Sequence, residues 1–203
     1  MKQVQVAWRG EDDPGRVDRA VMRIGETGLA AHGSSVTRSY ASAWSLDATD
    51  GWCTRTLDIS VHGAGWQRSL VLARDDGGQW AAVTRMSGLV DLPPAGLADP
   101  GSVDGALDGA VDCDIGLCPA TNTMPIRRLG LLHRVVPETR LVMAWVDVPS
   151  LRVVRSDQVY ASSSTRGRVR FGSASGDFHA ELTVDSDGIV GDYPGLARRL
   201  ATL

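Results

Sequence analysis

Apolar residues in this chain recur mainly at every second position, in short runs separated by glycine and proline. In the segment 52–62, Leu57, Ile59 and Val61 alternate with polar residues. Successive side chains of a β-strand point to opposite faces of a sheet, so this alternation predicts a strand with one buried face. Glycine-rich turns separate it from two similar segments, and the pattern predicts an antiparallel meander of 52–62, 66–74 and 79–85.

The segment 16–36 is compatible with either a helix or a hairpin. Val17, Val21 and Ile24 have helical spacing, but the turn residues Gly25–Gly28 favour the hairpin. Spaced leucines and paired arginines in the tail, 194–203, predict a short closing helix. Further strands are predicted in the second half of the chain at 141–148, 151–160, 166–171, 178–184 and 189–193.

Two blocks of antiparallel strands around one central segment predict a mainly β protein with minor α content. The expected architecture is a single large, curved antiparallel sheet or part-barrel, with short helices. The chain has 203 residues, which fits a single domain over 1–203. Residues 86–109 are rich in Gly, Pro and Asp and predict a long surface loop. Within it, 93–109 is interpreted as an insertion, which is either a lid or a local addition.

Charge and composition exclude several classes of function. The formal net charge is -3 and the basic residues are scattered, which argues against a nucleic-acid partner. No apolar run approaches the ~18 residues of a membrane span. The N-terminal segment is too polar for an export signal, so a cytoplasmic location is expected. The cysteines, Cys53, Cys113 and Cys118, follow neither a disulfide framework nor a zinc pattern, and neither a metal nor a cofactor is expected.

The densest group of polar residues lies between 112 and 128, and no known catalytic motif accompanies it. Asp112 and Asp114 alternate with apolar residues, as on a strand with one wet face. Asn122 follows between two prolines, and Arg127 and Arg128 come next. One interpretation is a structural knot in which the aspartates pair with the arginines. The other is a site in which the planar guanidinium groups hold an anionic or sugar headgroup.

Other polar residues are candidates for lining a pocket. Arg55 is in phase with Leu57 and Ile59, so it is expected on the apolar side, where it needs a partner, a route to solvent or a cavity. Gln158 and Tyr160 are in phase at the end of their predicted strand, and Tyr193 begins the tail. Each is otherwise an ordinary core or rim residue.

The run P-A-T-N-T-M-P-I-R-R-L at 119–129 resembles the T-N-T-L-P-I-R-R-L core of a bacterial family of putative glycolipid-binding proteins, formerly a domain of unknown function. Met124 replaces the usual leucine, a swap that conserves volume. The resemblance extends from about 28 to 199. Further matching pieces follow in the same order: W-C-T-R at 52–55, D-C-D-I at 112–115, V-D-V-P at 146–149, Q-V-Y at 158–160, and V-D-S-D-G to Y-P-G-L between 184 and 196.

The resemblance implies an antiparallel sheet rolled into an open half-barrel, similar to bacterial lipoprotein carriers and mycobacterial lipid-binding lipoproteins. Those carriers are exported, whereas this chain shows no export signal. The implied function is non-enzymatic binding of a small amphipathic ligand, a lipid or glycolipid, with its acyl chains in an apolar cavity of the curved sheet. The predicted ligand-binding residues are Arg55, Asp112, Asp114, Asn122, Arg127, Arg128, Gln158, Tyr160 and Tyr193.

Two other functions stay open at this point. The first is an enzyme, a hydrolase or isomerase, with Asp112 or Asp114 as base and Arg127 or Arg128 as oxyanion partner. No pairing of nucleophile and base supports it. The second is a non-catalytic interaction module in which the same cluster is structural.

Overall fold

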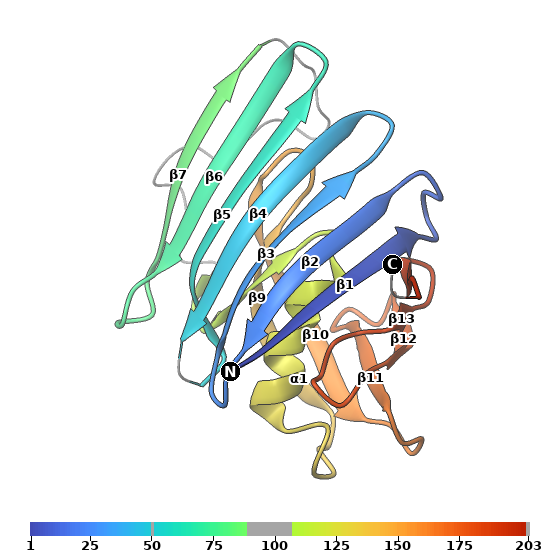
Figure 1. Ribbon diagram of the computed structural model, residues 1–203. Coiled ribbons are helices and arrows are strands. Elements are labelled where there is room, and N and C mark those ends of the chain that lie inside the picture. The colour runs from blue at the N-terminus through green and yellow to red at the C-terminus, as the bar shows by residue number, and fades with distance from the viewer. Residues whose placement is uncertain (50, 89–106, 202–203) are drawn as a thin grey trace.

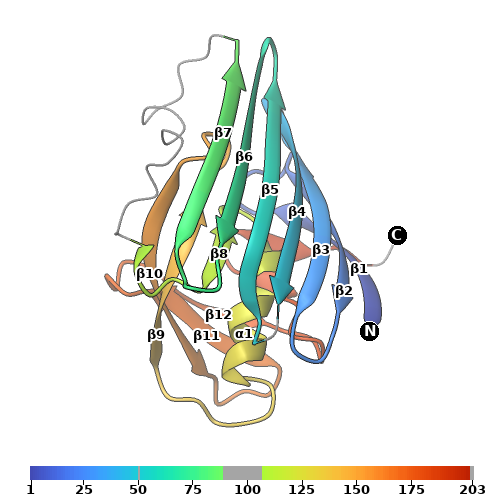
Figure 2. The same ribbon diagram turned by 90° about the vertical axis from the view of Figure 1, so that its left-hand side faces the viewer.

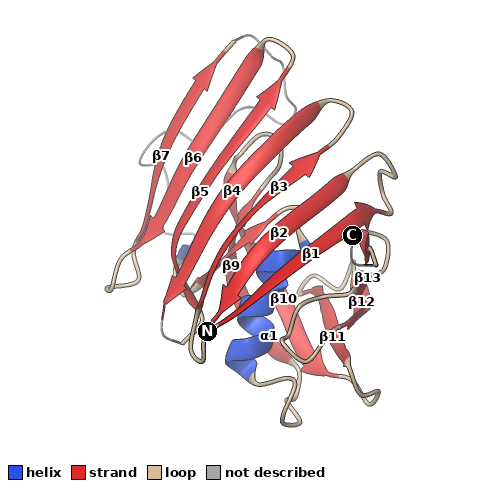
Figure 3. Cartoon of the chain, viewed as in Figure 1, coloured by secondary structure: helices blue, strands red, loops and turns tan. Residues whose placement is uncertain are grey.

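The computed structural model describes residues 1–49, 51–88 and 107–201. Two β-sheets pack against each other, and the helix α1 (Thr123–Leu129) lies between them (Figures 1 and 2). Met124 belongs to the core of the first sheet and Ile126 to the core of the second, so opposite sides of one short helix join the two. Strands make up most of the chain (Figure 3).

The first sheet has nine strands and is antiparallel between the neighbours for which pairing is described. Seven of these strands follow one another along the chain as a meander, and two short C-terminal strands extend it beside β1. In spatial order they are β13 (Asp192–Tyr193), β14 (Ala197–Arg199), β1 (Lys2–Gly10), β2 (Val17–Ile24), β3 (Leu29–Val36), β4 (Tyr40–Thr49), β5 (Cys53–Gly63), β6 (Trp66–Arg74) and β7 (Trp80–Ser87).

The second sheet has five strands. Its central strand β10 (Val153–Ser162) pairs antiparallel with β9 (Thr139–Val146) and β11 (Arg168–Ser173), and β12 (His179–Thr183) forms one edge. The other edge is β8 (Asp112–Ile115), which is parallel to β9. The short 3-10 helix η2 (Pro119–Asn122) leads from β8 into α1.

Alternation along the strands places the core of the first sheet on its inner face. On β4, for example, Trp44 and Leu46 are buried while Ser45 and Asp47 are exposed. At the centre of the sheet Leu57, Ile59 and Leu70 retain no accessible surface. A side chain without accessible surface has no space for a water molecule beside it, so packed side chains fill the centre of the inner face.

The predicted fold class is confirmed: the protein is mainly β, and one large antiparallel sheet stays open rather than closing into a barrel. The hairpin predicted at 16–36 is formed by β2 and β3, and the meander predicted from 52 to 85 is formed by β5, β6 and β7. The second sheet was not predicted, because the sequence pattern gives no sign that β8 to β12 pair separately from the first block.

The closing helix predicted for the tail is wrong. Residues Ala197–Arg199 form β14, which pairs with the end of β1, and the Leu200 amide donates to the Ala7 carbonyl at 2.8 Å. A strand here satisfies backbone groups that the edge of β1 would otherwise leave unpaired. Most of the predicted insertion at 93–109 lies outside the described residues. In the ranges that are described, no helix is long and apolar enough to cross a membrane.

Candidate functional site

The polar run that follows β8 folds back between the two sheets. Pro119 opens η2, and Pro125 lies in the first turn of α1, where its missing amide hydrogen leaves no bond broken. The helix ends at Gly130, whose φ of 71° is the left-handed conformation that glycine adopts without steric strain. Arg127 and Arg128 therefore lie in the last turn, the helix end that favours cations.

Arg128 holds the fully buried Asp112 with both arms of its guanidinium group. Nη1 donates to Asp112 Oδ1, and Nη2 donates to Oδ2 at 2.6 Å. Burial raises the pKa of the Asp112 carboxyl, and Arg128 opposes that rise. The expectation that Asp112 lies on a wet face is wrong. The strand β8 is covered on both sides, and Cys113 is as buried as Asp112.

Asp114 heads a second hydrogen-bonded group that links β8, η2 and β10. Thr121 Oγ1 donates to Asp114 Oδ1 and Gln158 Nε2 donates to Oδ2, each at 2.7 Å. Asn122 Nδ2 donates to the Tyr160 hydroxyl at 2.7 Å, and that hydroxyl donates to Gln158 Oε1 at 3.3 Å. Burial raises the pKa of Asp114 to about 6. The junction cluster is defined here as Asp112, Asp114, Thr121, Asn122, Arg128, Gln158 and Tyr160.

Tyr193 lies beside this cluster in a group of aromatic rings. Its ring centroid is 5.6 Å from that of Phe171, which is in turn 5.0 Å from Tyr160 in an edge-on arrangement. Burial raises the pKa of Tyr193 and that of Tyr160, and both phenols stay protonated. Tyr193 is therefore a packing residue next to the cluster.

Arg127 adjoins Arg128 in sequence, but its guanidinium group packs on an aromatic ring rather than on a carboxylate of the cluster. Its guanidinium carbon lies 4.8 Å from the centre of the Trp52 ring, a cation–π contact. On its other side the backbone of Gly188 approaches so closely that a Cβ there would lie 3.0 Å from Arg127 Cδ. Within the described part of the chain, Arg127 forms no ion pair.

Arg55 lies outside the junction cluster, and the prediction that it faces the apolar side is wrong. The pairing of β4 with β5 skips it: Asp47 is opposite Thr56 and Ala48 is opposite Thr54. This β-bulge reverses the alternation, so Arg55 is exposed. The bulge places Thr54 on the buried face instead. Thr54 Oγ1 accepts the Cys113 amide hydrogen at 2.9 Å. Thr54 and Thr121 contact the candidate site although neither was predicted for it. Their positions in the W-C-T-R piece at 52–55 and in the run at 119–129 are the signal that could have identified them.

The thiols near the cluster are not activated. Burial raises the pKa of Cys113 to about 12 and also raises that of Cys118. Nucleophilic catalysis by cysteine requires a lowered pKa, so neither thiol is poised as a nucleophile. In the portions of the chain described, no group of three or more His, Cys, Asp and Glu side chains is arranged to hold a metal ion.

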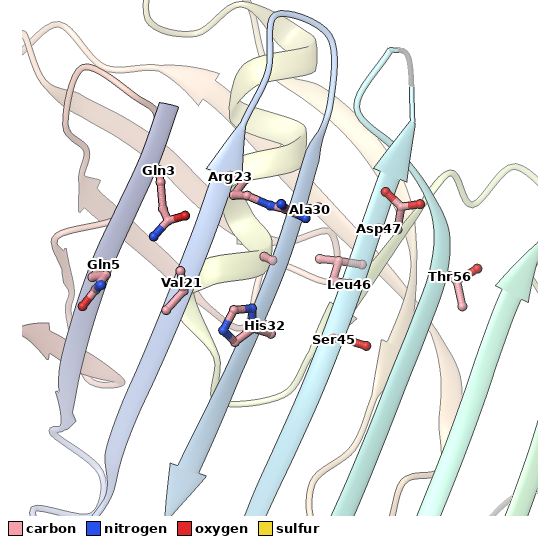
Figure 4. Close-up of a pocket in the computed structure, with 11 residues that line it drawn as sticks. Gln3, Gln5, Val21, Arg23, Ala30, His32, Ser45, Leu46, Asp47 and Thr56 are labelled. Carbon is pink, nitrogen blue, oxygen red and sulfur yellow. The ribbon is translucent and has the colours of Figure 1, made fainter. Parts of the chain in front are cut away.

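A separate groove of about 750 Å³ crosses the solvent face of β1 to β5, on the side of the sheet away from α1 (Figure 4). We call it the solvent-face groove. Val21 and Ala30 form part of its floor. Polar side chains from five neighbouring strands surround this floor: Gln3, Gln5, Arg23, His32, Ser45, Asp47 and Thr56. The same alternation that buries the inner face places these residues outside, but it does not reveal that they surround a hollow.

The polar run at 119–129, now seen as the link between the two sheets, belongs to a sequence pattern that spans almost the whole chain. The family described as "Putative glycolipid-binding" matches residues 5–199. The chain belongs to this family. Comparison with curated proteins gives no match.

A solved structure supports the same family assignment. A DUF1089 family protein from Pseudomonas aeruginosa is 27% identical and aligns with a TM-score of 0.69. The alignment covers 90% of this chain and 92% of that protein, so the likeness extends over almost the whole fold. The resemblance noted from the 119–129 run is therefore confirmed for the family, and the large open antiparallel sheet that it implied is confirmed as well.

Proposed function

We propose that this protein is a non-enzymatic binding protein for an amphipathic glycolipid and that the solvent-face groove holds the sugar headgroup. The family description supports the class of ligand. The observation that carries the proposal is the groove itself, with a volume of about 750 Å³ and hydrogen-bonding side chains from five strands. That volume falls within the ~300–1,000 Å³ of pockets that bind small molecules.

The chemistry of the groove fits sugar hydroxyls, each of which both donates and accepts hydrogen bonds. The amides of Gln3 and Gln5 donate and accept, as do the hydroxyls of Ser45 and Thr56. Exposed side chains of this kind lose only contacts with water when a ligand binds. The junction cluster is different, because a ligand there would have to replace internal hydrogen bonds of Asp112 and Asp114.

The packed interior leaves no room for acyl chains at the centre of the first sheet. The hypothesis from the sequence placed them in an apolar cavity of the curved sheet, with the headgroup at the arginines and aspartates. Leu57, Ile59 and Leu70 have no accessible surface, so a chain there would first have to separate the two sheets. We propose instead that the headgroup is recognised on the solvent face and that the junction cluster holds the sheets together.

Titration of the purified protein with an alkyl maltoside tests this proposal, with free maltose and a zwitterionic detergent of the same chain length as references. Asp47→Ala removes an acceptor from the groove and is expected to weaken maltoside binding about tenfold. Asp76→Ala, a matched change at an exposed turn outside the groove, is expected to bind like wild type. Equal affinity of wild type for the maltoside and the zwitterionic detergent would show that no sugar is recognised.

Two further readouts separate the remaining alternatives. If Arg127→Ala abolishes binding at unchanged stability while Asp47→Ala does not, the headgroup lies at the helix end and not in the groove. Mass spectrometry of the ligand after incubation addresses catalysis. We expect the intact maltoside, whereas released sugar would identify an enzyme.

A further inference from the structure

A second hollow, of about 550 Å³, lies at the end of the molecule beyond the C-terminus of α1. The loop that follows α1 and the turn between β10 and β11 both reach this end (Figures 1 and 2). Its wall contains three arginines together with exposed or half-buried apolar residues. We call it the basic hollow, and its defining residues are Leu132, Arg134, Val135, Arg166, Arg168 and Val184.

The arginines of the basic hollow carry more positive charge than nearby acids neutralise. Within the described residues, neither Arg134 nor Arg166 forms an ion pair. Arg168 faces Glu181 at 3.6 Å, and both side chains are partly exposed, so this is a weak surface pair. Asp185 also lines the hollow, but its carboxylate accepts from Arg199 at 2.7 Å. A cationic end thus forms on a chain whose formal net charge is -3.

Exposed and half-buried apolar residues lie beside these arginines. Val135 is 90% exposed, in the loop between α1 and β9, and Leu132 next to it is only half-buried. A valine so exposed has no packing role in the folded chain. Arginines grouped around an exposed apolar side chain match an anionic lipid surface, where cations meet phosphates and a small apolar group enters the interface.

We infer that the basic hollow docks on an anionic phospholipid surface. The apolar members favour lipid over nucleic acid. Among the described residues that line the hollow, His133 carries the only ring, and no Phe, Tyr or Trp provides the larger surface on which bases stack. The inference goes beyond glycolipid recognition and uses different residues from the solvent-face groove.

Vesicle co-sedimentation with the full chain tests the inference. Vesicles of phosphatidylcholine alone are compared with vesicles in which part of it is replaced by phosphatidylglycerol, and neither contains glycolipid. Wild-type protein is expected to bind only the phosphatidylglycerol vesicles. Binding should fall as salt is raised, because exposed charges that are farther apart than about 8 Å are largely screened from each other at 0.15 M salt.

Variants at exposed positions assign the binding to the basic hollow. Arg166→Gln is expected to weaken partitioning about fivefold, and Arg166→Gln with Arg168→Gln about thirtyfold. Val135→Asp should also weaken it. Arg85→Gln and Val83→Asp, matched changes on the exposed face of β7, should leave it unchanged. Unfolding midpoints equal to wild type exclude a folding defect.

Other outcomes would overturn the inference. Equal binding to both vesicles, or equal losses in the β7 variants, would show that the hollow is not a docking surface. Tighter binding of a DNA duplex or an acidic peptide than of the anionic vesicles would assign the hollow to another partner. The groove variant Asp47→Ala should bind these vesicles like wild type, so failure here is distinguishable from failure of the glycolipid proposal.

Discussion

The nine-stranded sheet and the junction between the two sheets are stabilised in different ways. In the sheet, apolar side chains such as Leu57 and Leu70 fill the inner face, and each contacts several neighbours that could adjust to a change. In the junction, each buried carboxylate depends on one or two specific partners. Asp112 depends on Arg128, and Asp114 depends on Thr121 and Gln158.

This difference determines how each region responds to damage. Apolar packing is non-directional, so a core residue can be exchanged for another of similar volume at a cost below about 1.5 kcal/mol. A buried charge has no such tolerance. Removing its partner leaves the charge without compensation in a region of low dielectric constant. The junction is therefore the more specific region and the more fragile one, and three changes test that contrast.

Arg128→Ala is expected to have the largest effect. It leaves the Asp112 carboxylate buried without its two charge-assisted bonds, and the free energy of unfolding should fall by about 3–5 kcal/mol. Denaturant unfolding followed by tryptophan fluorescence measures it. The neighbouring Arg127→Ala is the matched control, since loss of a cation–π contact costs about 0.5–1 kcal/mol.

The double variant Asp112→Leu, Arg128→Met serves where Arg128→Ala does not fold. It removes the charge together with its partner, and we expect it to recover much of the lost stability, as apolar replacements of buried pairs often do. Similar losses for Arg127→Ala and Arg128→Ala would contradict the contrast between the two arginines.

The pH dependence of stability tests the second carboxylate of the junction. The pKa of Asp114 is raised from 3.8 to about 6 in the folded protein. The folded state therefore holds this proton more tightly than the unfolded state does. Between about pH 4 and pH 6 the free energy of unfolding should fall as pH rises, by about 1–3 kcal/mol through this group.

Asp114→Asn should remove that part of the pH dependence. Asp112 and Asp18 also have raised pKa values, so the slope of wild type contains their contributions as well. The difference between wild type and Asp114→Asn isolates Asp114. Asp157→Asn is the control, because Arg155 lowers the pKa of that exposed carboxyl and its small contribution has the opposite sign. Identical slopes in wild type and Asp114→Asn would contradict the assignment.

The same contrast explains what could be predicted from the sequence. Strands β2, β3 and β5 to β7 were predicted from alternation and turn residues, because their pairing is local along the chain, whereas β4 was not predicted. The separate second sheet does not follow, because the parallel pairing of Asp112 with Met143 joins distant segments. The 112–128 run and the family motif identified the polar group. They did not show that Asp114 is bonded to Gln158, nor that Arg127 turns to Trp52.

The smallest expected effect concerns Arg55, which was predicted on the wrong face of its strand. Simple alternation puts Arg55 on the inner face of β5, where Arg55→Ala would remove a buried charge and alter stability by several kcal/mol. The bulge places it in solvent, so Arg55→Ala should change the free energy of unfolding by no more than about 0.5 kcal/mol.

Thr54→Val is the variant to compare with Arg55→Ala. It retains the shape but removes the oxygen that accepts the Cys113 amide hydrogen, and should cost about 1–3 kcal/mol in denaturant unfolding. A larger loss for Arg55→Ala than for Thr54→Val would mean that β5 runs without the bulge and that the junction is attached to the sheet in another register.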